Sequence, residues 1–453
     1  MNILTNNNLP EVIDLFSGCG GLALGFQKAG FHITHGIEIN REAVETASYN
    51  LNWRYGEESG HVCGDITKMD AVVFSDQIGP EGCIVIGGPP CQAYSLVGRA
   101  KLRSLGEHRI NTKDKRGYLY QDFLRFALDL KARAVIMENV PESTNYGEEN
   151  IPQTVCEILE ENGYEAYWTI LDAADYGVPQ VRERVFVIAV LKDENRRIEL
   201  PVPTHTSGED KLTQNQMRFN EFHDTCKNFV FPNRPGSDAE NWITVGEAFD
   251  DLPELFPTAQ TRYVLNRINM PMPYRTAAEN SYQELMRTWY GEDMGSVTGN
   301  CFRKTLRDFP IFAEMQQGDD YIKASEIADS HLEQACKARG ISEASNKEEY
   351  DNLKKEFVPP YDRENFTTKW QKLRADKPSH TLVAHLSVDT YSHIHPYEPR
   401  GISVREAARL QSFPDGFLFQ CNMGDAFKQI GNAVPPLLAE GIAIQVRKAF
   451  ENI

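Results

Sequence analysis

Hydrophobic and polar positions follow two alternating patterns over the first 190 residues of the chain. Short apolar runs, typical of buried strands, are separated by stretches whose apolar residues recur at helical spacing. The runs predict strands at 11–16, 32–38, 82–88, 133–139 and 184–191. The stretches between them predict helices near 21–29, 40–51, 118–130 and 152–162. This alternation indicates an α/β fold with a mostly parallel, doubly wound sheet that helices cover on both faces.

This alternation of strand and helix patterns ends near residue 195, and regular helical patterns return near residue 400. We therefore predict a first domain over 1–194, a second, smaller domain of mixed structure over 195–400, and a return to the first domain over 401–453. Two helices are expected in the last segment, from "SVREAARLQSF" (403–413) and "PPLLAEGIAIQVRKAF" (435–450).

The second domain contains a long acidic insert. Residues 311–364 hold thirteen Asp and Glu against seven Lys and Arg. Within them, "SNKEEYDNLKKEF" (345–357) predicts an exposed helix with Ser345 and Glu348 spaced as a capping box. We interpret this helix as a solvated surface element.

Charge and cysteine usage narrow the class of protein. The net charge is −18, from 47 basic and 65 acidic residues, which argues against a protein that coats nucleic acid by bulk attraction. The nine cysteines are scattered without a C-x-x-C pair, so we expect reduced thiols and no zinc site. The chain shows no secretory leader and no apolar run long enough to span a membrane, so we expect a cytoplasmic protein with no membrane partner.

One basic segment departs from the acidic background. Residues 99–116 carry seven Lys and Arg against two acidic residues, shortly after Cys91. A solvated loop would explain such a segment if it stood alone, and a local groove for nucleic acid is the alternative.

A glycine-rich turn follows the first predicted strand. In "DLFSGCGGLALGF" (14–26), Gly18, Gly20 and Gly21 would let a ligand approach the backbone closely. The next two strand ends carry Glu38, suited to ribose hydroxyls, and Asp65, suited to an adenine amino group, although both could simply cap helices. Neither a P-loop nor a strict G-x-G-x-x-G is present, so an adenosine cofactor without a polyphosphate fits best.

A second group of reactive side chains is expected at the same edge of the sheet. Cys91 follows two prolines in "GGPPCQAYS" (87–95), and proline stiffens the backbone that carries the thiol. Glu138 ends another strand in "MENV" (137–140). Arg182 and Arg184 alternate at a strand start in "PQVRERVFVIAV" (179–190) and should face one way. A thiol, a carboxyl and two guanidinium groups could therefore converge.

These sequences, in this order, resemble the DNA (cytosine-5) methyltransferase family. The resemblance rests on DLFSGCGG, GIEIN, GDIT, GGPPCQAYS, RGYLYQDFL, ENV, PQVRER, VREAARLQSFP and IGNAVPP, over about 1–192 and 400–440. It implies a Rossmann-like, S-adenosylmethionine-dependent methyltransferase core, with 195–400 as the target-recognition domain. It also implies methylation of C5 of a flipped-out cytosine in double-stranded DNA, of the bacterial restriction–modification type, without a metal.

The resemblance assigns catalytic roles to four residues. Cys91 would add to C6 of cytosine, Glu138 would protonate the base at N3, and Arg182 and Arg184 would orient the base. The basic segment would close over DNA, with contacts from Arg99, Lys101, Arg103 and Arg109. The gap between CQAYS and RGYLY is about ten residues longer than in the shortest family members, which leaves those contacts open.

The same matching assigns a cofactor site. Its predicted residues are Phe16, Gly18, Gly20, Gly21, Leu22, Glu38, Ile39, Asp65, Ile66, Pro89, Leu119, Asn432 and Val434. The last two would close the pocket from the far end of the chain, with the C-terminal helix beside the first strand. We expect a monomer whose partner is double-stranded DNA, and a separately encoded restriction endonuclease would be its cognate nuclease.

Three other interpretations stay open from the sequence. A tRNA cytosine-5 methyltransferase would use the same core, but about 200 residues between the PQVRER and VREAAR motifs favour DNA. A catalytically silent DNA-binding relative would have lost Cys91 or Glu138, and both are present. A dinucleotide oxidoreductase is the remaining alternative. His380, His385, His393 and His395 lack the regular spacing of metal ligands, and we expect them to contact phosphate or to pack locally.

Overall fold

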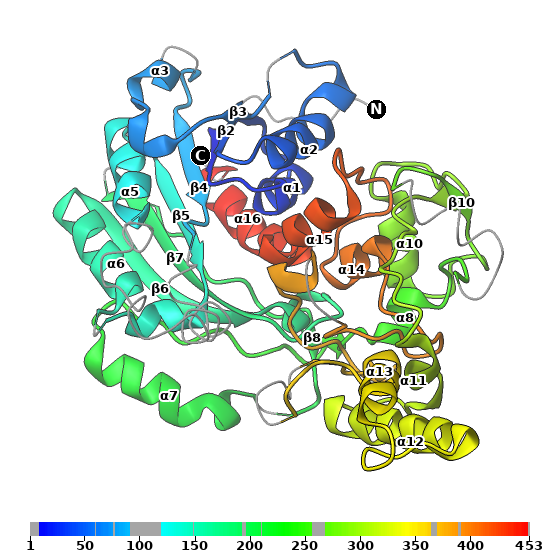
Figure 1. Ribbon diagram of the computed structural model, residues 1–453. Coiled ribbons are helices and arrows are strands. Elements are labelled where there is room, and N and C mark those ends of the chain that lie inside the picture. The colour runs from blue at the N-terminus through cyan, green and yellow to red at the C-terminus, as the bar shows by residue number, and fades with distance from the viewer. Residues whose placement is uncertain are drawn as a thin grey trace. The chain divides into compact units, whose positions relative to one another are not determined.

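The computed structural model divides the chain into two compact units. It describes residues 9–58, 60–75, 78–90, 119–147, 149–192, 196–209, 211–255, 268–363, 369–387 and 391–451 (Figure 1). The first unit comprises Met1–Ile243, Gln411–Phe413 and Asn432–Ile453, and the second comprises Thr244–Leu410 and Pro414–Gly431. By compactness, residues 195–243 fall in the first unit and most of 401–431 in the second. The roles assigned to the three predicted segments stay predictions.

A seven-stranded sheet forms the centre of the first unit. Its strands run in the order β3-β2-β1-β4-β5-β7-β6, and β7 is antiparallel to both of its neighbours. Their bounds are β1 Glu11–Leu15, β2 Ile33–Glu38, β3 Val62–Cys63, β4 Cys83–Gly87, β5 Ala134–Asn139, β6 Tyr164–Asp172 and β7 Glu183–Leu191. All five predicted strands are present, and the mostly parallel sheet is confirmed. The two-residue β3 and the long β6 were not predicted.

The pairing register brings the predicted ligand-binding segments to one edge. Leu15 pairs with both Ile37 and Gly87, and Gly87 pairs with Met137. The carboxyl ends of β1, β2, β4 and β5 therefore lie side by side, which is where open α/β sheets bind ligands. Because β7 is reversed, its first residues lie at this same edge, with Val185 opposite Asn139.

Helices cover both faces of this sheet. Figure 1 shows α5 and α6 on one side of the strands and α1 and α16 on the other. The α-helices of this unit are α1 Gly21–Lys28, α2 Arg41–Leu51, α3 Val72–Ser75, α5 Leu119–Asp129, α6 Ile151–Glu161, α7 Lys211–Thr225 and α16 Pro436–Glu451. Its short 3-10 helices are η1 Trp53–Tyr55, η2 Ile66–Lys68, η5 Pro141–Asn145 and η6 Ala173–Tyr176. Two further strands, β8 His205–Thr206 and β9 Glu240–Asn241, pair with each other. Asn40 and Asn150 cap α2 and α6 by accepting from backbone N–H groups of the first turn.

The core of the first unit lies between β-strands and helices. Fully buried apolar residues of β4 and β5 pack against Phe123 and Phe126 of α5 and Val155 of α6. On the opposite face, α1 packs closely against α16. A Cβ atom added to Gly25 of α1 would come within 2.4 Å of the Ala439 side chain of α16. The glycine therefore permits the close approach of the two helices.

The second unit is mostly helical. Its elements are α8 Val245–Phe249, α10 Ser281–Thr288, α11 Phe309–Glu314, α12 Tyr321–Arg339, α13 Lys347–Phe357, α14 Val404–Leu410, α15 Met423–Asn432 (its last residue counted with the first unit), the 3-10 helix η8 Ala384–Ser387, and the strand pair β10 Met272–Pro273 and β11 Ser296–Val297. In the part of the chain that the structure describes, no helix has the length and apolarity needed to cross a membrane.

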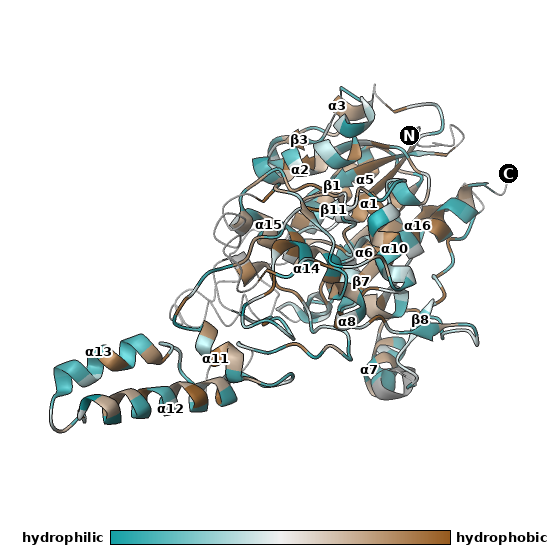
Figure 2. Ribbon diagram, turned by 90° about the vertical axis from the view of Figure 1, so that its right-hand side faces the viewer, coloured by the Kyte–Doolittle hydropathy of each residue, from teal (hydrophilic) through white to brown (hydrophobic). Residues whose placement is uncertain are grey.

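The acidic insert forms a pair of helices. Figure 2 shows α13 as mostly hydrophilic, while apolar and polar residues intermix along α12. Leu332 and Cys336 of α12 pack on Leu353 of α13. The predicted exposed helix is confirmed, but its predicted cap is wrong. Asn346, not Ser345, accepts from the backbone N–H of Glu349, because the helix begins one residue later than the capping-box spacing implied.

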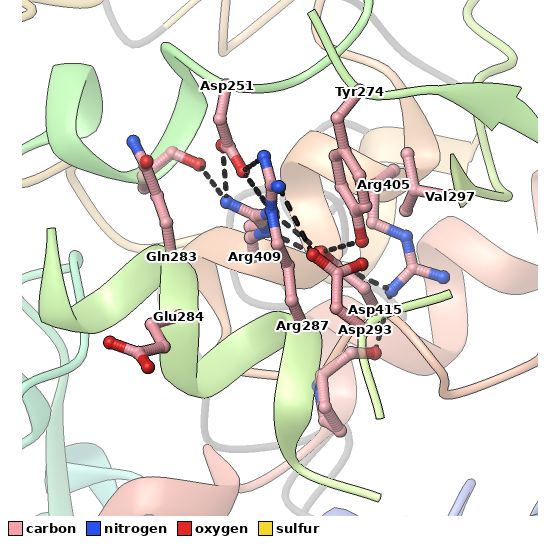
Figure 3. A network of polar contacts seen from close by, with 12 residues as sticks. Asp251, Tyr274, Gln283, Glu284, Arg287, Asp293, Val297, Arg405, Arg409 and Asp415 are labelled. Atoms are coloured by element: carbon pink, nitrogen blue, oxygen red, sulfur yellow. Dashed lines mark hydrogen bonds and ion pairs between the residues drawn. The ribbon is translucent and has the colours of Figure 1, made fainter. Parts of the chain in front are cut away.

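A buried ionic network organises the second unit around α14 (Figure 3). The Arg409 guanidinium bonds to both Asp251 and Asp415, at 2.8 and 2.6 Å. Arg287 bonds to the other Asp251 oxygen at 2.6 Å, and the Tyr274 hydroxyl donates to Asp415 at 2.7 Å. Because each buried charge has an opposite partner, the desolvation cost of burial is offset within the network.

Candidate active site

The glycine turn after β1 adopts the strained backbone that the sequence implied. Gly18 and Gly20 have φ angles of 54° and 87°, and Phe16 also has a positive φ of 57°. Only glycine enters this region at little cost. Glu38 supports the turn because its Oε2 atom accepts from Gly18 N at 3.0 Å, while Oε1 accepts from Asn40 N at 2.8 Å. Each carboxylate oxygen keeps a second lone pair for a ligand.

Two polar groups under this turn lack a partner among the described residues. They are the Asp14 Oδ2 atom, on β1, and the Ser17 hydroxyl, in the turn, and both side chains are buried. Burial and then the nearby Glu38 charge raise the pKa of Asp14 well above its ordinary value. Buried polar atoms without partners are costly, so they indicate a place where a polar ligand completes the hydrogen bonding.

The ends of β2 and β3 supply an apolar surface beside these polar groups. Ile39 is 70% exposed, which is unusual for isoleucine, whereas Ile66 is buried. Asp65 caps η2 by accepting from Thr67 N, and it pairs with Lys68 at 2.9 Å. These hydrogen bonds, from Lys68 first and then Thr67, lower the pKa of Asp65. Asp65 thus has a capping role, and adenine binding stays a prediction.

The far end of the chain reaches the start of α1, as the sequence suggested. A Cβ atom on Gly21 would lie 2.4 Å from the Val434 carbonyl oxygen. Leu22 and Val434 are buried, while Asn432 is exposed. Leu119 is the first residue of α5, which precedes β5. An exposed isoleucine, free carboxylate capacity, buried polar atoms without partners and a tight glycine turn together fit an adenosine cofactor that carries an amino acid.

The carboxyl end of β5 holds the predicted Glu138 in a buried ion pair. Arg184 Nε lies 2.9 Å from Glu138 Oε1, and both side chains are about nine-tenths buried, with relative exposures of 10% and 11%. Burial raises the pKa of Glu138, and the charges of Arg184 and Arg182 oppose this without cancelling it. The group is therefore easier to protonate than an exposed glutamate.

The segment that leads to Cys91 lies directly against Glu138. A Cβ atom on Gly88 would be 2.9 Å from Glu138 Oε2, and Asn139 Nδ2 donates to the Pro89 carbonyl at 3.4 Å. Pro89 is buried. Cys91, the second residue after Pro89 in the sequence, lies outside the described residues, as do Arg99, Lys101, Arg103 and Arg109.

Arg182 and Arg184 bond to different partners, while the charges of both act on Glu138. The Arg182 Nη2 atom donates to the Ala433 carbonyl at 3.2 Å, and its backbone N–H donates to Asp172. Arg182 is the residue before β7, and the common orientation of the two arginines stays a prediction. Arg184 makes an ion pair with Glu138.

Three histidines of the second unit, His380, His393 and His395, pack locally, and the side chain of His385 lies outside the described residues. His380 and His393 stack with ring centroids 3.9 Å apart, and His395 stacks on Phe249. Burial lowers the pKa of His380 to about 4. In the described part of the chain no group of three or more His, Cys, Asp or Glu side chains is placed to hold a metal ion.

Several residues of this site were not predicted. Gly88 lies in GGPPCQAYS, and Asp14 and Ser17 lie in DLFSGCGG. The pair of glycines before the prolines could have indicated that Gly88 has no room for a side chain. Gln180 and Gln411 are fully buried polar residues that bond to each other. Nothing in the local sequence pattern links two glutamines that are 231 positions apart.

Comparison with known proteins gives, over nearly the whole chain, the family that the sequence motifs resemble. Residues 11–448 match the family model of the C-5 cytosine-specific DNA methylases. The chain is 52% identical, over 99% of its length and 97% of the relative, to M.OihORF3336P of Oceanobacillus iheyensis, whose name assigns it to the type II methyltransferases. It is 29% identical to the type II methyltransferase M.AgeI of Thalassovita gelatinovora, over 97% of this chain and 100% of that one.

A solved structure shares the fold. It is described as a DNA modification methyltransferase encoded within a prophage of E. coli, and it matches with a TM-score of 0.63 at 22% identity, covering 98% of this chain and 99% of that chain. The mostly parallel seven-stranded sheet with one reversed strand is thus the Rossmann-like fold of a methyltransferase.

The fold and the site define a methyltransferase of the α/β class. The chain belongs to the family of C-5 cytosine-specific DNA methylases, and it is a DNA (cytosine-5-)-methyltransferase of the type II restriction–modification kind. The resemblance inferred from the sequence motifs is confirmed. The DNA substrate class is favoured over tRNA, and the oxidoreductase alternative has no support.

Proposed function

We propose that this enzyme transfers a methyl group from S-adenosylmethionine to C5 of a flipped-out cytosine in double-stranded DNA, through a covalent bond between Cys91 and C6. The observation that carries the proposal is the buried Glu138–Arg184 pair against Gly88 and Pro89. Because only Pro90 separates Pro89 from Cys91 in the sequence, we expect the thiol to lie near the Glu138 carboxyl. The methylation would protect host DNA from a cognate restriction endonuclease.

The roles of the residues follow from the weak nucleophilicity of C5 in cytosine. Addition of the Cys91 thiolate to C6 forms a C–S bond and moves electrons toward N3, where the Glu138 carboxyl donates a proton. The raised pKa of Glu138 favours the protonated form that this step needs. C5 becomes electron-rich as a result. After methylation, loss of the C5 proton restores the double bond and expels the Cys91 thiolate.

Arg184 keeps the proton donor in place. Its guanidinium fixes one carboxyl oxygen of Glu138, so the other oxygen is free to face the base. The positive charges of Arg184 and Arg182 would stabilise the negative charge that develops on the ring. Arg182 is held from the other side by the Ala433 carbonyl, which restricts its orientation.

The cofactor would lie across the ends of β1, β2 and β3. When bound, S-adenosylmethionine supplies an electrophilic methyl group. Glu38 would accept from the ribose hydroxyls, Ile39 and Phe16 would pack on the adenine ring, and Asp14 and Ser17 would find polar partners in the amino acid part. The turn at Asn432 and Val434 would close the site beside Gly21.

DNA must present the target base outside the duplex. C5 and C6 are covered in the base stack, so the base is flipped into the site. The basic segment 99–116, with Arg99, Lys101, Arg103 and Arg109, would contact the phosphates and balance the acidic body of the enzyme.

The covalent step is tested with a duplex that contains 5-fluorocytosine at the methylated position. Fluorine cannot leave as a cation, so the wild-type enzyme should be trapped as a denaturant-resistant adduct. The variant Cys91→Ser should bind S-adenosylmethionine and DNA but form no adduct. An adduct that persists in Cys91→Ser would refute the assignment, and bisulfite sequencing of host DNA identifies the site to place in the duplex.

A further inference from the structure

A three-residue segment of the VREAARLQSFP motif belongs to the first unit, although its neighbours on both sides belong to the second. Gln411, Ser412 and Phe413 are each fully buried, whereas Leu410 and Pro414 are counted with the second unit. A buried glutamine is uncommon, because both ends of its amide need partners. The contacts of this segment are therefore informative.

The Gln411 amide is held at both ends. Its Nε2 atom donates to the Ala433 carbonyl at 2.5 Å, and its Oε1 atom accepts from Gln180 Nε2 at 2.5 Å. Because a backbone carbonyl can only accept, the amide cannot be flipped without losing this bond. The same Ala433 oxygen also accepts from Arg182 Nη2 at 3.2 Å. Gln411 and Arg182 thus share one carbonyl.

Ala433 lies between the two residues predicted to close the cofactor site. Asn432 and Val434 flank it in the chain, and the Val434 carbonyl abuts Gly21 at the start of α1. A displacement of the Ala433 peptide would therefore move the cofactor wall and the anchor of Arg182 together. The bond from Gln411 opposes that displacement.

The rest of the segment supports the same turn. The Ser412 hydroxyl accepts from Leu437 N at 3.2 Å, in the first turn of α16, and Ser412 has a positive φ of 59°. The Phe413 ring lies where a Cβ atom on Gly21 would meet it at 3.2 Å. All three residues of the segment therefore contact the 432–434 turn or the elements on either side of it, α1 and α16.

We propose that Gln411 is a positioning residue for methyl transfer, which holds the Ala433 carbonyl so that the 432–434 turn and Arg182 keep their places in the active site. The proposal rests on the proposed function of Arg182, Asn432 and Val434. Gln411 acts through these groups and does not contact the reacting atoms.

The test compares Gln411→Met with a matched control, Gln27→Met. Gln27 is also a buried glutamine of the first unit, and its amide donates to the Leu51 backbone carbonyl at 2.8 Å. Both changes keep the side-chain length and remove an amide donor to a carbonyl. Binding of S-adenosylmethionine and of duplex DNA is measured by calorimetry, with the melting temperature recorded for each variant.

Loss of one buried hydrogen bond should weaken S-adenosylmethionine binding by Gln411→Met about tenfold. The DNA affinity of Gln411→Met should change by less than about twofold. Gln27→Met should bind the cofactor as the wild type does, even if its melting temperature is lower. Gln180→Met removes only the hydrogen bond from Gln180 to Gln411 and keeps the bond from Gln411 to Ala433, so it should weaken cofactor binding less. The double variant should be less than additive, because both residues act through one carbonyl.

Cofactor binding by Gln411→Met within about twofold of the wild type would overturn the proposal, as would equal weakening in Gln27→Met. If Gln411→Met does not fold, Gln180→Met is compared with Gln27→Met instead, and cofactor binding by Gln180→Met that is no weaker than that of Gln27→Met would overturn the proposal. The 5-fluorocytosine adduct separates this proposal from the proposed function. A wild-type enzyme that forms no adduct contradicts the function, whereas a trapped wild type with unaltered cofactor binding in the variants contradicts only the role of Gln411.

Discussion

Glu138 shows what could and could not be predicted for a single residue. Its place at a strand end follows from the apolar run before it and from the ENV motif. The identity of its partner does not, because two arginines at alternate positions looked equivalent in the sequence. In the structure Arg184 makes an ion pair with Glu138, and Arg182 Nη2 donates to the Ala433 carbonyl, while the charges of both arginines act on Glu138.

Gly88 offers a direct test of the carboxyl position. In Gly88→Ala the new methyl group would lie 2.9 Å from Glu138 Oε2, so the carboxyl must shift away from its pair with Arg184. We expect the methyl-transfer rate to fall about 10- to 100-fold, with S-adenosylmethionine affinity unchanged. Single-turnover transfer of labelled methyl groups measures the rate.

Gly79→Ala is the control for that change. A Cβ atom at Gly79 would be 3.5 Å from Glu11 Oε1, which is an ordinary contact with a carboxylate of the same sheet. Its rate should match that of the wild type. Equal rates for Gly88→Ala and wild type would mean that the Glu138 position does not limit the reaction.

At the level of elements, the apolar patterns predicted most of the first unit and little of the second. Strands β1, β2, β4, β5 and β7 and the helices between them were recognisable because their periodicities are long and regular. The strand β6 and the helix α12 were missed. The reversal of β7 could not be predicted either, because strand direction depends on which neighbour a strand pairs with and not on its own sequence.

The packing of α1 against α16 can be tested at Gly25. A Cβ atom there would lie 2.6 Å from both Glu440 N and the Pro436 carbonyl, and backbone atoms cannot turn aside as a side chain can. Gly25→Ala gains up to about 1 kcal/mol in helix propensity, yet overpacking costs about 1–3 kcal/mol. We therefore expect a net loss of unfolding free energy, measured by urea titration.

Gly441→Ala is the matched control on α16. Its added methyl group would meet the edge of the Tyr176 ring at 3.2 Å, which can shift by a small amount, and Pro201 Cβ at an ordinary contact distance of 3.7 Å. Stability should stay within about 1 kcal/mol of the wild type. If Gly25→Ala proved as stable as Gly441→Ala, the close contact between α1 and α16 would not be needed for folding.

For the whole molecule, buried histidines predict sensitivity to acid. Burial, with His35 nearby, lowers the pKa of His61 in the first unit to about 3, and burial lowers that of His380 in the second unit to about 4. In the unfolded chain both groups take up a proton near pH 6.5. Protons therefore favour the unfolded state once the pH falls below about 6.5, and stability is fully present above it.

The expected result is a fall in unfolding free energy of about 1.4 kcal/mol per pH unit for each histidine between about pH 6 and pH 4. Urea titrations across that range measure the slope. Replacing His61 by phenylalanine should reduce the slope for the first unit. An unchanged slope in that variant would show that His61 titrates normally in the folded chain.

The pairing of α1 with α16 sets the order of events during protein synthesis. A ribosome makes the glycine turn and α1 within the first 28 residues, but the helix that covers α1 comes from residues 436–451. Until those residues have been made, this face of α1 has no helix to pack against, so the core of the first unit can form completely only after nearly the whole chain has been synthesised. A premature stop codon that removed α16 would therefore leave α1 uncovered, however much of the preceding chain had been made.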